Sequence, residues 1–151
     1  DLLKQQAVPV WGPHADDGYL LESLPQTTAS YASYGFPIAE AFVPDGWLSE
    51  GGKLKVGAYE FDVLHIPGHT PGHVVFYCAA EKLLIAGDVL FYESIGRTDF
   101  PRGNHADLIS NITGKLLVLP EDTRVIPGHG RMTKKKKKKR HNDHNWARKA
   151  T

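Results

Sequence analysis

Three short apolar stretches of this 151-residue chain each end at a side chain that can bind a metal ion. His69 and His129 each follow a Pro-Gly turn, and Asp88 directly follows the run Leu-Ile-Ala-Gly at 84–87. The prolines and glycines exclude a helix and expose the side chains that follow them. Imidazole and carboxylate groups together suit zinc, with iron or manganese as alternatives. The pattern therefore predicts a divalent metal site formed by His69, Asp88 and His129.

These three side chains can meet only if the strands before them end at one edge of the same sheet. Apolar runs bounded by turn residues predict where the elements lie. Strands are predicted at 8–11, 53–56, 59–66, 73–78, 82–86 and 124–126, and helices at 16–24 and 106–119. Asn104 is the predicted cap of the second helix, and 25–47 is predicted to be a structured surface segment. Strands mixed with helices indicate a layered α/β architecture in one domain.

Charge is divided unevenly between the body of the chain and its end. Residues 1–133 carry 9 Lys and Arg against 16 Asp and Glu, whereas 134–151 carry 9 against 1. The six consecutive lysines at 134–139 repel one another, so a solvated linker is predicted there. Nucleic-acid binding is not expected, because proteins that bind it usually add aromatic side chains or a structured basic face. We expect a folded body at 1–133, a basic linker at 134–140 and a further segment at 141–151.

The sequence lacks the features of a membrane or secreted protein. No run of about 18 apolar residues occurs, and residues 1–4 do not resemble the start of a signal peptide. A soluble, cytoplasmic protein without a membrane partner is predicted. Cys78, the only cysteine, lies in an apolar run and is predicted to be a buried strand thiol rather than a nucleophile.

The three predicted ligands resemble, in order and in strand context, the later metal motifs of the metallo-β-lactamase superfamily. Within that superfamily, the chain is similar to the short bacterial glyoxalase II-like hydrolases. The similar stretches lie at 34–37, 44–48, 67–76, 87–91 and 96–103. This resemblance covers about residues 8–133 and implies a four-layer αββα sandwich of the α/β class.

One part of the family pattern is displaced in this chain. The family carries a His-x-His-x-Asp-His motif, preceded by two or more strands, before the first strand predicted here. The segment at 141–146 matches the last four positions of that motif, with Lys139 in place of its first histidine. If the chain is read from this motif to residue 151 and then onward from residue 1, the spacing from the motif to the next strand is that of the family. The sandwich is therefore expected to be incomplete or permuted.

The resemblance implies a two-metal site that the displaced motif completes. The expected ligands are His69 and His141 on one ion and Asp143, His144 and His129 on the other, with Asp88 bridging both. Zinc is the first expectation for both ions. A water between them loses a proton near neutral pH and attacks the carbonyl carbon of the substrate. Asp88 and Asp143 thus belong to the expected catalytic centre, and Arg97 is expected either to bind a substrate carboxylate or to pair with Asp99.

The activity that the resemblance implies is hydrolysis of a small acyl thioester, such as a hydroxyacylglutathione, through a metal-bound hydroxide. Two alternatives stay open. Persulfide dioxygenases share the fold and a similar Gly-Arg-Thr-Asp stretch, found here at 96–99, but they use a single iron. With Lys139 in a ligand position, an inactive metal-binding fragment is the other alternative.

The remaining histidines are expected to serve structure rather than to bind metal. His73 begins a strand and is predicted to support His69 without touching the metal itself. His65 lies inside a strand and is predicted to be structural, while His14 and His105 are predicted to face solvent.

Overall fold

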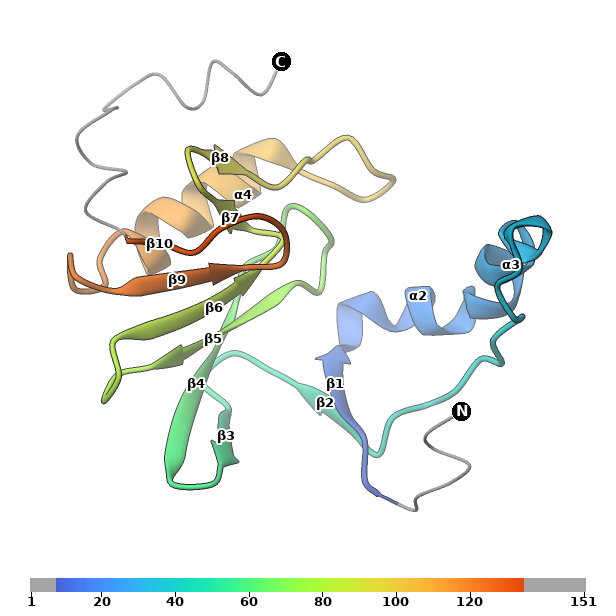
Figure 1. Cartoon of the computed structure of the whole chain (residues 1–151), viewed down its shortest axis with the longest axis horizontal. Helices are drawn as coiled ribbons and strands as arrows, with labels where there is room; N and C mark the ends of the chain where they lie inside the picture. Colours follow the sequence, from blue (N-terminus) through green and yellow to red (C-terminus); the bar gives the residue numbers. More distant parts are fainter. Residues whose placement is uncertain (1–7, 135–151) are drawn as a thin grey trace.

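A six-stranded sheet forms the centre of the structure, a computed structural model that describes residues 8–134. Its strand order is β10-β9-β6-β5-β4-β3 (Figure 1). The bounds are β3 Lys53–Val56, β4 Tyr59–His65, β5 Val74–Cys78, β6 Leu83–Gly87, β9 Arg124–Pro127 and β10 Thr133–Lys134. Neighbouring strands are antiparallel except β6 and β9, which run parallel. The ends of β4, β6 and β9 therefore lie at the same edge of the sheet, as the predicted site requires.

One face of this sheet is covered by a helix, α4 (His105–Asn111), which continues as a π-helical turn, η3 (Ile112–Leu116). Leu108 on this helix is fully buried in the same core cluster as Val75 and Leu84 of the sheet. Asn104 caps α4 as predicted, because its side chain accepts a hydrogen bond of 3.1 Å from the backbone N–H of Asp107. The helix ends three residues earlier than predicted.

Two smaller sheets flank the main one. β1 (Trp11–His14) pairs with β2 (Gly46–Leu48) in parallel, and β7 (Leu90–Phe91) pairs with β8 (Ser94–Ile95) in antiparallel. The prediction of a buried strand at 8–11 is wrong. The strand begins at Trp11, whose exposed fraction is 62%, and Val8 is 54% exposed. Within the described residues β1 has β2 as its one strand neighbour, so the side chains near its start stay at the surface.

The helix predicted at 16–24 is broken into separate short pieces. They are η1 (Ala15–Asp17), α2 (Gly18–Glu22) and α3 (Leu24–Ala29), and η2 (Ala32–Tyr34) follows them. Pro25 has no backbone N–H to donate, so it is accommodated in the first turn of a new helix rather than inside a continuous one. These pieces lie beside β1 and β2, apart from α4 (Figure 1).

The layered α/β architecture predicted from the sequence is confirmed by these sheets and helices. Cys78 is fully buried in β5, as predicted. Among the described residues, no helix has the length and apolar character needed to cross a membrane. The predicted boundary between a folded body and a basic linker stays a prediction.

Candidate metal centre

The turn that carries His69 joins β4 to β5 at the common edge of the sheet. Gly68 in this turn has a φ of +138°, and a Cβ there would collide with Leu108 on α4. Its carbonyl oxygen accepts a hydrogen bond of 2.8 Å from the backbone N–H of Asn104, immediately before the helix. Only glycine suits this backbone conformation and this close approach. The turn is thus fixed against the start of α4.

His69 presents one ring nitrogen outward and has the other one occupied. Its Nδ1 lies 2.8 Å from the backbone oxygen of Arg97, so Nδ1 carries the proton and donates it to that carbonyl. This tautomer leaves a lone pair on Nε2, which lies 3.8 Å from Oδ2 of Asp88. The ring also packs edge-on against Phe100 at a centroid distance of 5.3 Å. A histidine whose second nitrogen is held by a backbone carbonyl is typical of metal sites.

Asp88 follows β6, and a glycine of the neighbouring β9 turn lies directly against its carboxylate. Gly128 approaches so closely that a Cβ at that position would collide with Oδ1 of Asp88. The backbone N–H of Gly128 donates a hydrogen bond of 2.8 Å to the oxygen of Gly87, which holds the ends of β6 and β9 together. The two glycines explain why Asp88 and the residue after Gly128 come into contact.

That next residue, His129, lies against the second oxygen of the same carboxylate. Its Nδ1 is 2.9 Å from Oδ1 of Asp88, within hydrogen-bond distance. The side chain of His129 is 79% exposed, whereas that of His69 is 15% exposed. The structure therefore brings His69, Asp88 and His129 together at one edge of the sheet, with a histidine at each oxygen of the carboxylate.

The chemistry and spacing of these groups fit a divalent metal ion. Two donor atoms bound to one zinc ion at its usual bond lengths lie roughly 3.3 Å apart in a tetrahedral site. The 3.8 Å between His69 Nε2 and Asp88 Oδ2 is close to that value and too long for a hydrogen bond. His129 instead makes a direct hydrogen bond to Asp88. His69 and Asp88 thus have the better geometry for an ion, with His129 beside them.

His73 is a buried neighbour of this cluster. Its ring centroid lies 5.8 Å from that of His69, and its Nε2 is buried without a hydrogen-bond partner. Burial, followed by the nearby His69, lowers the pKa of His73 to about 4. The ring is therefore neutral at pH 7.

Asp17 also holds the His69 turn in place, a role that was not predicted from the sequence. Its carboxylate, in a residue 6% exposed, accepts two hydrogen bonds of 2.7 Å, from the hydroxyl of Thr70 and from the backbone N–H of Gly72. A Cβ on Gly72 would lie 2.6 Å from the carboxyl carbon of Asp17. The partners of these hydrogen bonds are 53 and 55 residues apart in the sequence, so no local sequence pattern could have predicted them.

A second cluster of metal-type side chains lies beneath this turn. The ligand atoms of His14, Asp16 and His65 all lie within 4.8 Å of one another. The rings of His14 and His65 are stacked, with centroids 3.9 Å apart and planes 10° from parallel. Stacked parallel rings direct their in-plane lone pairs past each other, which is unfavourable for holding one ion. The prediction that His14 faces solvent is wrong, because its side chain is 18% exposed and covered by His65.

Arg97 pairs with Asp99, which is one of the two roles expected for it. The guanidinium donates two hydrogen bonds of 2.7 Å to the two carboxylate oxygens and lies 4.3 Å from the centroid of the Phe100 ring. The pairing raises the pKa of Arg97 and lowers the pKa of Asp99 to about 2. Through its backbone oxygen, the same residue holds His69. A role for the Arg97 side chain in substrate binding stays a prediction.

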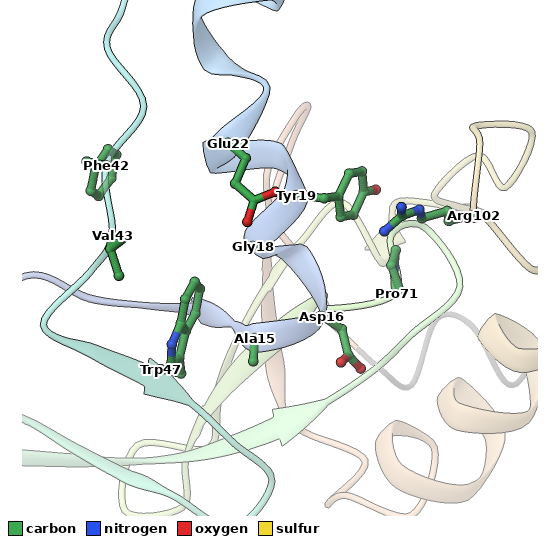
Figure 2. Close-up of a pocket in the computed structure, with 10 residues that line it drawn as sticks. All are labelled: Ala15, Asp16, Gly18, Tyr19, Glu22, Phe42, Val43, Trp47, Pro71 and Arg102. Atoms are coloured by element: carbon green, nitrogen blue, oxygen red, sulfur yellow. The ribbon is translucent and has the colours of Figure 1, made fainter.

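A pocket of about 580 Å³ lies next to the His69 turn, because Pro71 of that turn is one of its lining residues (Figure 2). Its lining residues are Ala15, Asp16, Gly18, Tyr19, Glu22, Phe42, Val43, Trp47, Pro71 and Arg102. Arg102 lies over the ring of Tyr19, with its guanidinium carbon 4.1 Å from the ring centroid. No residue of this pocket was singled out from the sequence as a binding group.

The other predicted ligands, His141, Asp143 and His144, lie outside the described residues, as does Lys139. Their roles stay predictions.

Comparisons with known proteins agree with this geometry. The family model described as "Metallo-beta-lactamase superfamily" matches residues 1–129. The chain is 46% identical over 142 residues to the hydroxyacylglutathione hydrolase GloC of Haemophilus influenzae, covering 93% of this chain and 66% of GloC. It is 48% identical over 88 residues to the probable metallo-hydrolase YqgX of Bacillus subtilis, covering 58% of this chain and 42% of YqgX. The chain thus spans about two thirds or less of these curated relatives.

Solved structures give the same result for the fold. The chain is similar to the BLEG-1 B3 metallo-beta-lactamase, with a TM-score of 0.78 and 39% identity, covering 94% of this chain and 67% of that one. It is similar to TTHA1623 in a di-iron-bound form, with a TM-score of 0.76 and 35% identity over the same shares. For ETHE1 from Myxococcus xanthus the TM-score is 0.63 and the identity 27%, covering 88% of this chain and 60% of that one.

Proposed function

Because the chain belongs to the metallo-beta-lactamase superfamily and has its fold, we propose that it is a metal-dependent hydrolase of small acyl thioesters of the hydroxyacylglutathione kind. The observation that carries the proposal is the state of His69. Its Nδ1 proton is donated to Arg97, and its free Nε2 faces the Asp88 carboxylate. The identity of 46% to GloC supports the choice of substrate class.

In this proposal His69, Asp88 and His129 hold divalent metal, with zinc first and iron or manganese as alternatives. We propose that three residues outside the described part of the chain complete a two-metal site, with His141 joining His69 on one ion and Asp143 and His144 joining His129 on the other. Such ions, when bound, would lower the pKa of water towards about 7 and polarise the carbonyl group that is attacked.

Residues of this chain orient the proposed metal ligands and shield them from water. The carbonyl of Arg97 fixes the tautomer of His69, and the Asp88 carboxylate turns one oxygen to each histidine. Phe100 packs against the ring of His69, so one side of it is shielded from water. The Arg97 side chain can bind a substrate carboxylate, as proposed, only if it releases Asp99.

A second candidate is an iron-dependent oxidoreductase similar to the persulfide dioxygenases, which use a single iron. The similar structure TTHA1623, in a di-iron-bound form, supports iron as the metal but not a single-ion site. The two candidates use the same three side chains and differ in the metal content and in the product.

Elemental analysis of the purified full chain, combined with an activity assay, tests the proposal. We expect close to two zinc ions per chain and hydrolysis of a lactoyl-glutathione thioester that stops on chelation and returns with zinc. The exposed His129 can be changed to alanine without disturbing the core, and His129→Ala should lower both metal content and turnover. The matched control is His105→Ala, which removes a histidine outside the cluster.

Each other outcome contradicts the proposal in a different way. One iron per chain with oxidation of a persulfide and no thioester hydrolysis would establish the oxidoreductase instead. Little metal and no turnover, even after zinc addition, would identify an inactive metal-binding fragment.

A further inference from the structure

The pocket beside the His69 turn is not used in the hydrolysis proposed above. It is formed in part by the same turn and loop that hold the candidate metal ligands. Pro71, two residues after His69, forms part of its wall. The loop at 96–103 contacts His69 through the backbone of Arg97 and places Arg102 at the pocket. One turn and one loop therefore connect the pocket to the candidate metal site.

Arg102 is positioned in this pocket and available to a ligand. Its backbone has a φ of +68°, a left-handed conformation that is uncommon for a residue other than glycine and recurs at functional sites. Its guanidinium lies over the Tyr19 ring, which orients the side chain. Within the described residues it makes no ion pair with a carboxylate, whereas Arg97 in the same loop is paired with Asp99. Arg102 therefore has free donors for an anionic ligand group.

The rest of the pocket offers groups of the opposite charge and an aromatic wall. Glu22 is an exposed carboxylate at the pocket, whereas Asp16, which also lines it, has its Oδ2 3.5 Å from Nδ1 of His14. Gly18 lies between these two residues in the sequence, and the Trp47 ring lies beside it (Figure 2). The ring would be 3.2 Å from a Cβ on Gly18, so it occupies the space that a side chain would fill there. A ligand that carries both a carboxylate and an ammonium group matches this arrangement.

We propose that this pocket binds the peptide portion of a thioester substrate, with Arg102 holding a carboxylate and Glu22 attracting an ammonium group. This inference rests on the proposed function, because it assigns a place to the thiol half of that substrate. An extended tripeptide spans about 10 Å. Pro71 of the pocket wall is two residues from His69, so a peptide bound in the pocket lies next to the turn that carries the candidate metal ligand.

With this pocket, the enzyme would discriminate between thioester substrates by their thiol half rather than by their acyl group. A hydrogen-bonded pair between guanidinium and carboxylate is among the stronger polar contacts. An acyl thioester of cysteamine has no carboxylate, so it gains nothing from Arg102. Discrimination between thiols should therefore depend on Arg102.

Binding of free glutathione to the full chain, followed by calorimetry, tests the pocket without any turnover. We expect Arg102→Gln to weaken glutathione binding by about tenfold or more, in line with the loss of a charged hydrogen-bonded pair. Arg102→Lys should restore part of the affinity by keeping the charge. The control is Arg124→Gln, because Arg124 is an exposed arginine on β9 that pairs with Glu81 away from the pocket.

Kinetics on two thioesters that share a lactoyl group complete the test. With lactoyl-glutathione, Arg102→Gln should raise KM by a similar factor and leave kcat nearly unchanged. With lactoyl-cysteamine, the variant and the parent should behave alike. Glutathione binding and KM that Arg102→Gln leaves untouched would overturn the pocket assignment, even if thioester hydrolysis is observed. Arg102-dependent binding of glutathione in a chain without hydrolysis would keep the pocket and refute the proposed function.

Discussion

Replacing Asp17 should loosen the turn that carries His69 before it affects the rest of the fold. Both carboxylate oxygens are used, one by the Thr70 hydroxyl and one by the Gly72 N–H, each at 2.7 Å. Asp17→Ala leaves the buried N–H of Gly72 without a partner, at a cost of about 1–3 kcal/mol, and removes the charged partner of the partly buried Thr70 hydroxyl, a hydrogen bond worth about 1.5–3 kcal/mol. We therefore expect Asp17→Ala to lower the free energy of unfolding by roughly 2–6 kcal/mol. Urea unfolding at pH 7 measures this loss.

The variant Asp17→Asn keeps the shape of the side chain and removes its charge. Its amide oxygen can accept from the Gly72 N–H while its NH₂ group donates to the Thr70 hydroxyl, so both contacts persist in neutral form. The expected loss is about 1–2 kcal/mol, the difference between charged and neutral hydrogen bonds. The control is Asp122→Asn, which changes an exposed carboxylate that pairs with Lys82 and does not contact the turn.

Metal affinity shows whether Asp17 positions His69 or only stabilises the fold. At a urea concentration where both variants remain folded, Asp17→Asn should bind zinc more weakly than Asp122→Asn, and amide exchange at Gly72 should be faster. If Asp17→Ala unfolds at the same urea concentration as the parent protein, the two hydrogen bonds contribute nothing and the reasoning is refuted. Equal zinc affinity in the two Asn variants would leave Asp17 with a purely structural role.

Three further predictions concern the turn, the helix and the loop around the site. Gly68→Ala should strongly destabilise the fold, because the new Cβ would collide with Leu108 and φ is positive; Gly114→Ala, with open space around it, should stabilise by about 0.5–1 kcal/mol. Thermal unfolding of both variants measures the contrast in sign. NMR titration should show the Asp99 carboxyl with a pKa of about 2, returning towards 3.8 in Arg97→Gln. Because its folded pKa is lowered, any stability that the pair contributes is present above pH 4 and lost as the pH falls towards 2, and salt should weaken it. Chelation should raise the flexibility of His129 more than that of His69, measured by NMR relaxation of the imidazoles, because 79% of the His129 side chain is exposed.

The meeting of His69, Asp88 and His129 could be predicted because each residue follows a strand directly. Local sequence shows where each strand ends, whereas a common strand direction had to be assumed; the parallel pairing of β6 with β9 agrees with that assumption and brings their ends to one edge. The cap at Asn104 is likewise a local contact, three residues from its partner. Contacts of this kind leave a signature in the sequence that a single chain can show.

What could not be predicted depends on contacts between distant segments. Asp16 and Asp17 are adjacent and chemically identical, yet one is exposed and the other is buried against a turn more than 50 residues away. The helical pattern at 106–119 gave no sign of the π-helical turn, in which the N–H of Leu117 bonds to Ile112. The exposure of Trp11 depends on which strands lie beside β1, and this too is a tertiary property.

The two arginines of the loop at 96–103 show how structure changes a functional assignment made from resemblance. Arg97 was expected either to bind a substrate carboxylate or to pair with Asp99, and it donates two hydrogen bonds to Asp99. Replacing that partner with a substrate carboxylate exchanges one ion pair for another and gains little. Arg102 has no carboxylate partner among the described residues, so a ligand carboxylate there forms a new pair. If one of the two arginines selects the substrate, the balance of ion pairs favours Arg102, while Arg97 acts through the carbonyl that fixes His69.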